Sequence, residues 1–119
     1  MTDSLLDLRA KINTFVTERD WAQFHTPKNL AMAMIVEAAE LVEKFQWDTP
    51  EESMQLSAEK RQAVSHELAD TFVYLLRIAE VLEIDLIAAA NEKIKLNALK
   101  YPAEKARGSN AKYTSYSED

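Results

Sequence analysis

Residues 30–42, LAMAMIVEAAELV, decide the fold. Every residue in this stretch is apolar except Glu37 and Glu40. A helix at a protein surface carries a broad polar stripe, so a helix with only two polar residues must be covered nearly all round. A single chain of 119 residues offers few ways to cover it. We therefore expect an all-α fold with this helix at its centre, and we expect the chain to form a homo-oligomer.

Three further segments carry apolar residues at helical spacing, which predicts four helices in all. Thr26 and Pro27 suit the N-cap and the first turn of the central helix, which we expect to run to about residue 46. Four helices with short connections are typical of a four-helix bundle or a close relative. The other three helices are predicted at residues 4–19, 57–82 and 86–100, with a polar connection at residues 47–56.

The last helix is expected to stop at Pro102, so we place the folded domain at residues 1–102. Residues 103–119 are polar and have no helical period. They predict a C-terminal tail that is either disordered or laid over the body of the protein.

The composition excludes several kinds of protein. Cysteine is absent, which excludes disulfides, zinc–thiolate sites and cysteine nucleophiles. A net charge of −6 disfavours binding to a nucleic acid polymer, because phosphate contacts need clustered Lys and Arg. No apolar run reaches the ~18 residues of a membrane span. The first ten residues lack a signal-peptide pattern, so we expect a cytoplasmic protein without membrane contact.

Two pairs of acidic residues carry the chemistry. Glu37 and Glu40 are three residues apart, and so are Glu67 and Asp70 on the next long helix. Residues at this spacing lie on neighbouring positions of a helix surface. If the two helices face each other, four carboxylates converge. Their mutual repulsion and their desolvation are costly unless a cation is present.

The ligand set indicates which cation is expected. It consists only of carboxylate oxygens, which favours Mg²⁺, with Mn²⁺ as a substitute, over zinc or copper. Di-iron bundles usually supply a Glu-x-x-His motif from two helices, and neither His25 nor His66 has that spacing from a glutamate. The alternative is that these acids lie on solvated helix faces.

The paired acids and the sequence around them resemble the MazG-like all-α nucleoside-triphosphate pyrophosphohydrolases. Residues 37–40 (EAAE) and 67–70 (ELAD) match the E-x-x-E and E-x-x-D signature of that family, and the similarity is closer to its dCTP pyrophosphatase branch. The resemblance covers nearly the whole chain and is strongest at residues 19–47, 66–76, 93–102 and 105–114.

The resemblance implies Mg²⁺-dependent hydrolysis of a nucleoside triphosphate to the monophosphate and pyrophosphate, in nucleotide-pool sanitation. It favours dCTP or modified pyrimidine deoxynucleotides as substrates. It makes Glu37, Glu40, Glu67 and Asp70 the metal ligands, and Glu37 or Glu40 the group that accepts a proton from the attacking water. It also implies a tetramer built as a dimer of dimers, with sites near subunit interfaces.

The family positions further imply contacts to the triphosphate. Lys93, Asn97 and Lys100 are expected on one side of the last helix, where Lys and Asn donors suit phosphate oxygens. The alternative is a solvated polar face. Arg107 and Lys112 would reach the phosphates only if the tail folds over the site.

The family positions also imply a pocket for the base. Trp21, His25 and Trp47 flank the central helix, and an indole can stack on a nucleobase. Trp47 could instead anchor a helix end in the core, and His25 could be an ordinary loop histidine. Tyr74 lies four residues after Asp70 and is expected either to order the sugar or carboxylates or to be a core residue.

Two alternative functions remain open from the sequence. The same site could act on dUTP or on nucleoside triphosphates broadly. The chain could instead be a helical interaction module whose acids hold a structural cation.

Overall fold

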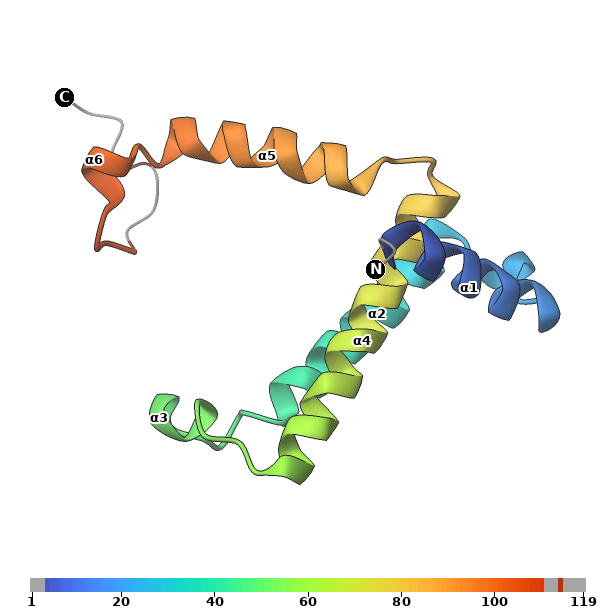
Figure 1. The fold of residues 1–119 in the computed structure, drawn as a ribbon, viewed down its shortest axis with the longest axis horizontal. Coiled ribbons are helices and arrows are strands. Elements are labelled where there is room, and N and C mark those ends of the chain that lie inside the picture. Colours follow the sequence, from blue (N-terminus) through green and yellow to red (C-terminus); the bar gives the residue numbers. More distant parts are fainter. Residues whose placement is uncertain (1–3, 111–113, 115–119) are drawn as a thin grey trace. The chain divides into compact units, whose positions relative to one another are not determined.

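A computed structural model of the chain describes residues 4–110 and 114. These residues are helical throughout their regular structure and contain no strand, which confirms the all-α class. Among them, no helix is both long enough and apolar enough to cross a membrane. The elements (Figure 1) are α1 (Ser4–Glu18), the 3₁₀ helix η1 (Ala22–Phe24), α2 (Pro27–Glu43), α3 (Pro50–Ser53), α4 (Ala58–Val81), α5 (Leu86–Lys100) and α6 (Ala103–Ala106).

Three of the four long helices begin where the sequence predicts, because polar side chains cap them. The Thr26 hydroxyl accepts a hydrogen bond from the backbone N–H of Asn29 at 3.2 Å. Ser57 caps α4 through the N–H of Lys60 at 3.1 Å. Asp85 caps α5 in the same way. Each side chain satisfies a donor that the first turn of a helix leaves without a partner.

The connection at residues 47–56 contains a short helix that we did not predict. Thr49 accepts from the N–H of Glu52 at 3.1 Å, and the Glu52 carboxylate accepts from the N–H of Thr49 at 2.9 Å. This reciprocal pair is a capping box, and Pro50 occupies the first helical position. These local preferences suffice to turn the polar connection into α3. The central helix α2 also ends at Glu43, earlier than expected.

The chain divides into two compact units between Glu83 and Ile84. In the first unit α2 and α4 pack along each other and α1 packs against α4 (Figure 1). The second unit contains α5 and α6. Of the four predicted long helices, three therefore belong to the first unit and the fourth belongs to the second unit.

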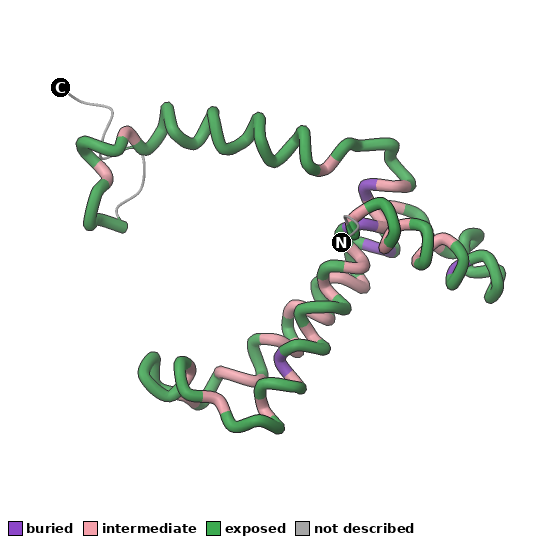
Figure 2. The backbone as a smooth tube through the Cα atoms, viewed as in Figure 1, coloured by how far each residue is buried: buried purple, intermediate pink, exposed green. Residues whose placement is uncertain are grey.

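The core of the first unit is thin (Figure 2). The buried apolar residues among those described are Val16, Leu30, Val64, Leu76 and Ala79. Helix α2 packs against α4 on one side only, so Ile35 and Val42 remain more than 60% exposed, at 63% and 61%. Within the first unit α2 packs against α4 alone, so much of its apolar surface stays exposed there.

Candidate functional site

The contact between α2 and α4 gathers acidic side chains. Glu37 from α2 and Glu67 and Asp70 from α4 each offer a carboxylate oxygen, and these oxygens all lie within 4.8 Å of one another. The spacing of three residues places Glu67 and Asp70 on the same side of α4. Glu40 lies one turn beyond Glu37 and is hydrogen-bonded to it, but its oxygens are outside this closest group. The structure thus brings three of the four predicted ligands to one point.

The cluster has an electrostatic problem that a cation would solve. The pKa of Glu37 is raised to about 7, mainly by burial and also by hydrogen bonds with Glu67 and Glu40 and by the negative charges of Glu40 and Asp70. The Oε2 atom of Glu67 is buried without a hydrogen-bond partner. Within residues 4–83 the ion pairs involve other acids, so no Lys or Arg of the first unit forms an ion pair with this group. A buried carboxylate oxygen without a partner is energetically costly, and a divalent cation would supply the missing partner.

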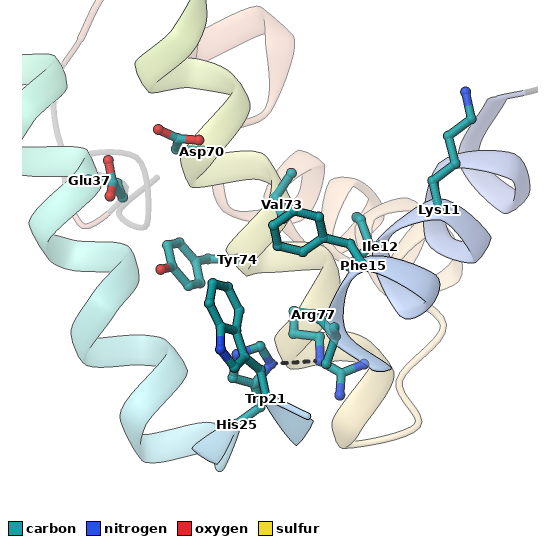
Figure 3. A pocket seen from close by; sticks show the side chains of 11 residues that line it. Lys11, Ile12, Phe15, Trp21, His25, Glu37, Asp70, Val73, Tyr74 and Arg77 are labelled. Carbon is teal, nitrogen blue, oxygen red and sulfur yellow. Dashed lines mark hydrogen bonds between the residues drawn. The ribbon is translucent and has the colours of Figure 1, made fainter. Parts of the chain in front are cut away.

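A pocket of about 460 Å³ opens beside the acids. Figure 3 shows Glu37 and Asp70 at one end of it, Tyr74 and Trp21 along its length, and His25 with Arg77 at the other end. The wall formed by α1 contributes Lys11, Ile12, Phe15 and Val16. The pocket therefore joins a carboxylate cluster to an apolar, aromatic chamber. That combination suits a ligand with an anionic part that carries a cation and a flat ring.

The turn after α1 puts Trp21 into the pocket. Asp20 has a φ of 54°, in the left-handed region. The N–H of Asp20 donates to the carbonyl of Thr17 at 3.1 Å, and the N–H of Trp21 donates to the carbonyl of Val16 at 3.0 Å. These two bonds form a Schellman motif, which reverses the chain at the end of a helix. The Trp21 ring then meets Phe15 edge to face, with centroids 5.6 Å apart.

The far end of the pocket is polar. The Arg77 Nε donates to Nδ1 of His25 at 3.1 Å, and its Nη1 donates to Oδ1 of Asn13 at 3.0 Å. Burial lowers the pKa of His25, and the positive charge of Arg77 lowers it further. The imidazole is therefore neutral at neutral pH.

Comparison with known proteins places this arrangement in a family. The model of the MazG-like family matches residues 32–115, which include all four predicted metal ligands. This chain belongs to the MazG-like family.

Relatives and a solved structure agree with that membership. The human protein called dCTP pyrophosphatase 1 is 42% identical over 113 residues, which are 93% of this chain and 66% of that protein. The mouse protein of the same name is 40% identical over the same shares of both chains. The chain thus spans just under two thirds of the length of these relatives. A pyrophosphatase from Archaeoglobus fulgidus has a TM-score of 0.80 and 36% identity, covering 86% of this chain and 95% of its own.

Other residues expected from the MazG-like resemblance are not gathered at this pocket. Trp47 follows α2, is 88% exposed and does not line the pocket. Lys93, Asn97 and Lys100 are exposed on α5, which belongs to the second unit. Their roles stay predictions. Arg107 is exposed after α6, and Lys112 lies outside the described residues.

Sequence reasoning missed the part of the pocket built by α1 and by Arg77. Asp70, Tyr74 and Arg77 are spaced by four and three residues, so they share one face of α4. That spacing could have indicated that Arg77 lies on the same side of α4 as Asp70 and Tyr74. Ile12 and Phe15 gave no such signal, because apolar residues at helical spacing are equally expected in a core.

The raised pKa of Glu37 predicts how the metal-free protein responds to pH. Between about pH 4.5 and pH 7 the folded protein keeps a proton on Glu37 that the unfolded chain releases. This contribution to stability is fully present below pH 4.5 and is lost as pH rises through 7. Thermal melting in EDTA across this range should therefore show a smaller loss of stability with rising pH in Glu37→Gln than in wild type.

Glu43→Gln is the matched control, since Glu43 is exposed on the same helix and outside the cluster. Its melting curves should follow those of wild type. Identical pH profiles for Glu37→Gln and wild type would contradict the burial of Glu37 among the other acids.

Proposed function

We propose that this chain is a Mg²⁺-dependent nucleoside-triphosphate pyrophosphohydrolase that releases pyrophosphate and a nucleoside monophosphate. One observation carries the proposal: carboxylates from two helices converge at one end of an aromatic pocket, and no basic residue of the described first unit pairs with them. The pyrophosphatase names of the human, mouse and archaeal relatives support it.

The acids fit the metal that this chemistry needs. Glu37, Glu40, Glu67 and Asp70 would hold Mg²⁺, or Mn²⁺ in its place, through an all-oxygen ligand set. When bound, the cation supplies charge neutralisation for the phosphate oxygens and acidifies an attacking water. Glu37 or Glu40, on α2, would accept the proton of that water. Lys93, Asn97 and Lys100 are proposed donors to the triphosphate.

The pocket favours a flat base as the other half of the substrate. Trp21 and Tyr74 line the pocket with aromatic rings, and His25 adds a polar group at its far end. We propose dCTP or a modified pyrimidine deoxynucleotide, because the human and mouse relatives are named for dCTP. Trp47 is proposed as a further contact to the base.

Pyrophosphate release across the eight common deoxynucleoside and ribonucleoside triphosphates and dUTP, with Mg²⁺ present, tests this function. Release that is fastest with dCTP supports the proposal. Equal release from all of them, or a preference for dUTP, would keep the reaction and overturn the substrate. No release from any nucleotide, combined with a melting temperature that Mg²⁺ still raises, would indicate a structural cation site instead.

Removing one metal ligand should separate activity from stability. Glu67→Gln and Glu40→Gln should each lower the rate of pyrophosphate release by on the order of 100-fold, because a charged ligand is lost. Each should melt at a higher temperature than wild type in EDTA, since one repelling charge is gone. Mg²⁺ should raise the melting temperature of wild type more than that of either variant, because it binds the folded state.

Glu43→Gln again serves as the control and should match wild type in all three measurements. If Glu67→Gln and Glu40→Gln behave like this control, the acids are not the metal site.

The two tryptophans should contribute to binding of the base and not to the metal site. Trp21→Ala and Trp47→Ala should raise KM for dCTP, because losing one stacking partner costs about 1–3 kcal/mol. The Mg²⁺-dependent rise in melting temperature should persist in both variants. Trp21→Phe and Trp47→Phe should each keep most of the binding that the alanine variants lose. An unchanged KM in Trp47→Ala would remove Trp47 from the site, and the same result for Trp21→Ala would contradict stacking in the pocket.

We also propose that the chain assembles as a homo-oligomer, with a tetramer formed as a dimer of dimers as the expected state. The apolar side chains that one chain leaves exposed on α2 and α4 support this proposal; they include Met32, Ile35, Val36, Val42, Leu68 and Phe72.

Light scattering at micromolar concentration should give a mass above that of the 13.6 kDa chain. Ile35→Lys should shift the protein toward smaller species, because it places a charge on the apolar face. Glu43→Lys adds a lysine at an exposed polar position of the same helix and should not. A wild-type protein that stays monomeric would overturn the proposal.

A further inference from the structure

A continuous chain of hydrogen bonds links α1 and α4 to the far end of the pocket. Arg9 is hydrogen-bonded to the Glu80 carboxylate, and Nδ2 of Asn13 donates to Oε1 of Glu80 at 3.3 Å. On its other side, Oδ1 of Asn13 accepts from Nη1 of Arg77 at 3.0 Å. The Nε of Arg77 then donates to Nδ1 of His25 at 3.1 Å. Each member of this chain fixes the next.

The direction of every bond is dictated by the groups at its ends. Hydrogen bonds from Arg9 and then from Asn13 lower the pKa of Glu80, so its carboxylate is ionised and only accepts. The Asn13 amide must therefore turn its NH₂ group to Glu80 and its oxygen to Arg77. A guanidinium has no acceptor atom, so Arg77 donates to both of its partners.

His25 receives the end of this chain. Because Arg77 donates to Nδ1, that nitrogen carries no proton. Burial and the charge of Arg77 keep the ring neutral by lowering its pKa. A neutral imidazole without a proton on Nδ1 carries its proton on Nε2. No described residue makes a recorded hydrogen bond to this Nε2, and Figure 3 shows the ring among the residues that line the pocket.

We propose that Arg77 is a positioning residue that fixes His25 as a hydrogen-bond donor through Nε2, so that the pocket selects a base with an acceptor at that point. This inference rests on the proposed function. A base of the cytosine type presents an unprotonated ring nitrogen beside its carbonyl, whereas uracil and thymine carry a proton on the corresponding nitrogen. A fixed N–H donor on Nε2 can hydrogen-bond to the unprotonated ring nitrogen of cytosine. On uracil or thymine the same donor would face another N–H donor.

Arg77 is needed because an unconstrained neutral histidine exchanges its proton between the two ring nitrogens. In one form Nε2 donates, and in the other it accepts, so the ring adapts to either edge and discriminates poorly. A site whose polar group has one fixed role rejects the wrong partner, since the mismatch leaves a buried group unpaired.

The state of the ring can be measured without any nucleotide. Nitrogen-15 chemical shifts of the free protein distinguish the two neutral forms. The chain has two histidines. Nε2 of His66 lies 2.9 Å from Nε2 of Gln62 and is not part of this network, so His66 is an internal control. We expect Nε2 of His25 to carry the proton in wild type and both forms to be populated in Arg77→Met. A proton on Nδ1 in wild type, or a ring unaffected by Arg77→Met, would overturn the proposal.

Base preference then tests the functional consequence. The ratio of kcat/KM for dCTP to that for dUTP should fall by about 10-fold in Arg77→Met, the effect of one well-placed hydrogen bond. In a His25→Phe background the same Arg77→Met change should leave the ratio unaltered. A further fall in that background would show that Arg77 contacts the nucleotide itself, which contradicts a positioning role.

Two elements of the design separate a failure of the proposed function from a failure of the role of Arg77. If wild type releases pyrophosphate from neither nucleotide, the proposed function fails while the ring measurement still decides the role of Arg77. If Arg77→Met does not fold, Arg77→Lys keeps the positive charge and loses the two-point contact to His25 and Asn13. It should shift the ring and the base preference in the same direction, and an unchanged ring in Arg77→Lys would overturn the proposal.

Discussion

The packing of α2 against α4 is the interaction on which the candidate site depends. Apolar contacts along these two helices hold Glu37 close to Glu67 and Asp70, although the three charges oppose that approach. Burial of apolar surface is not directional and favours this approach, whereas the desolvation of Glu37 and the negative charges of the neighbouring acids oppose it. The site is thus a strained feature inside a stable helix pair. The pKa of Glu37 is raised to about 7, first by burial and then by hydrogen bonds and charge from the neighbouring carboxyls.

The pocket divides along its length into two parts with different physical roles. At one end carboxylates face each other without a counter-charge, and at the other end Arg77 brings a positive charge beside a neutral histidine. Aromatic rings separate the two ends. This order suits a ligand whose charged and flat parts are recognised separately, by a cation at one end and by ring contacts with hydrogen bonds at the other.

Much of this architecture could be predicted from the sequence because the signals are local. Thr26, Ser57 and Asp85 cap their helices within three residues, and the two acid pairs follow the helical repeat. The hydrogen-bonded chain at the far end could not be predicted in this way. Arg9 and Glu80 are 71 residues apart, and His25 and Arg77 are 52 apart, so only tertiary packing joins them. Trp47 lies just before α3 and is exposed, so its expected contact to the base stays a prediction.

The two ends of the pocket are also held by different parts of the chain. The carboxylates need only α2 and α4, whereas the wall of the aromatic chamber is largely built from α1 and from the turn at Asp20 and Trp21. Substitutions in α1 can therefore reshape the chamber while the carboxylates stay in place. Such a division makes the fold adaptable over evolution: residues such as Ile12 and Phe15 can change the shape of the chamber while the carboxylate cluster is inherited unchanged.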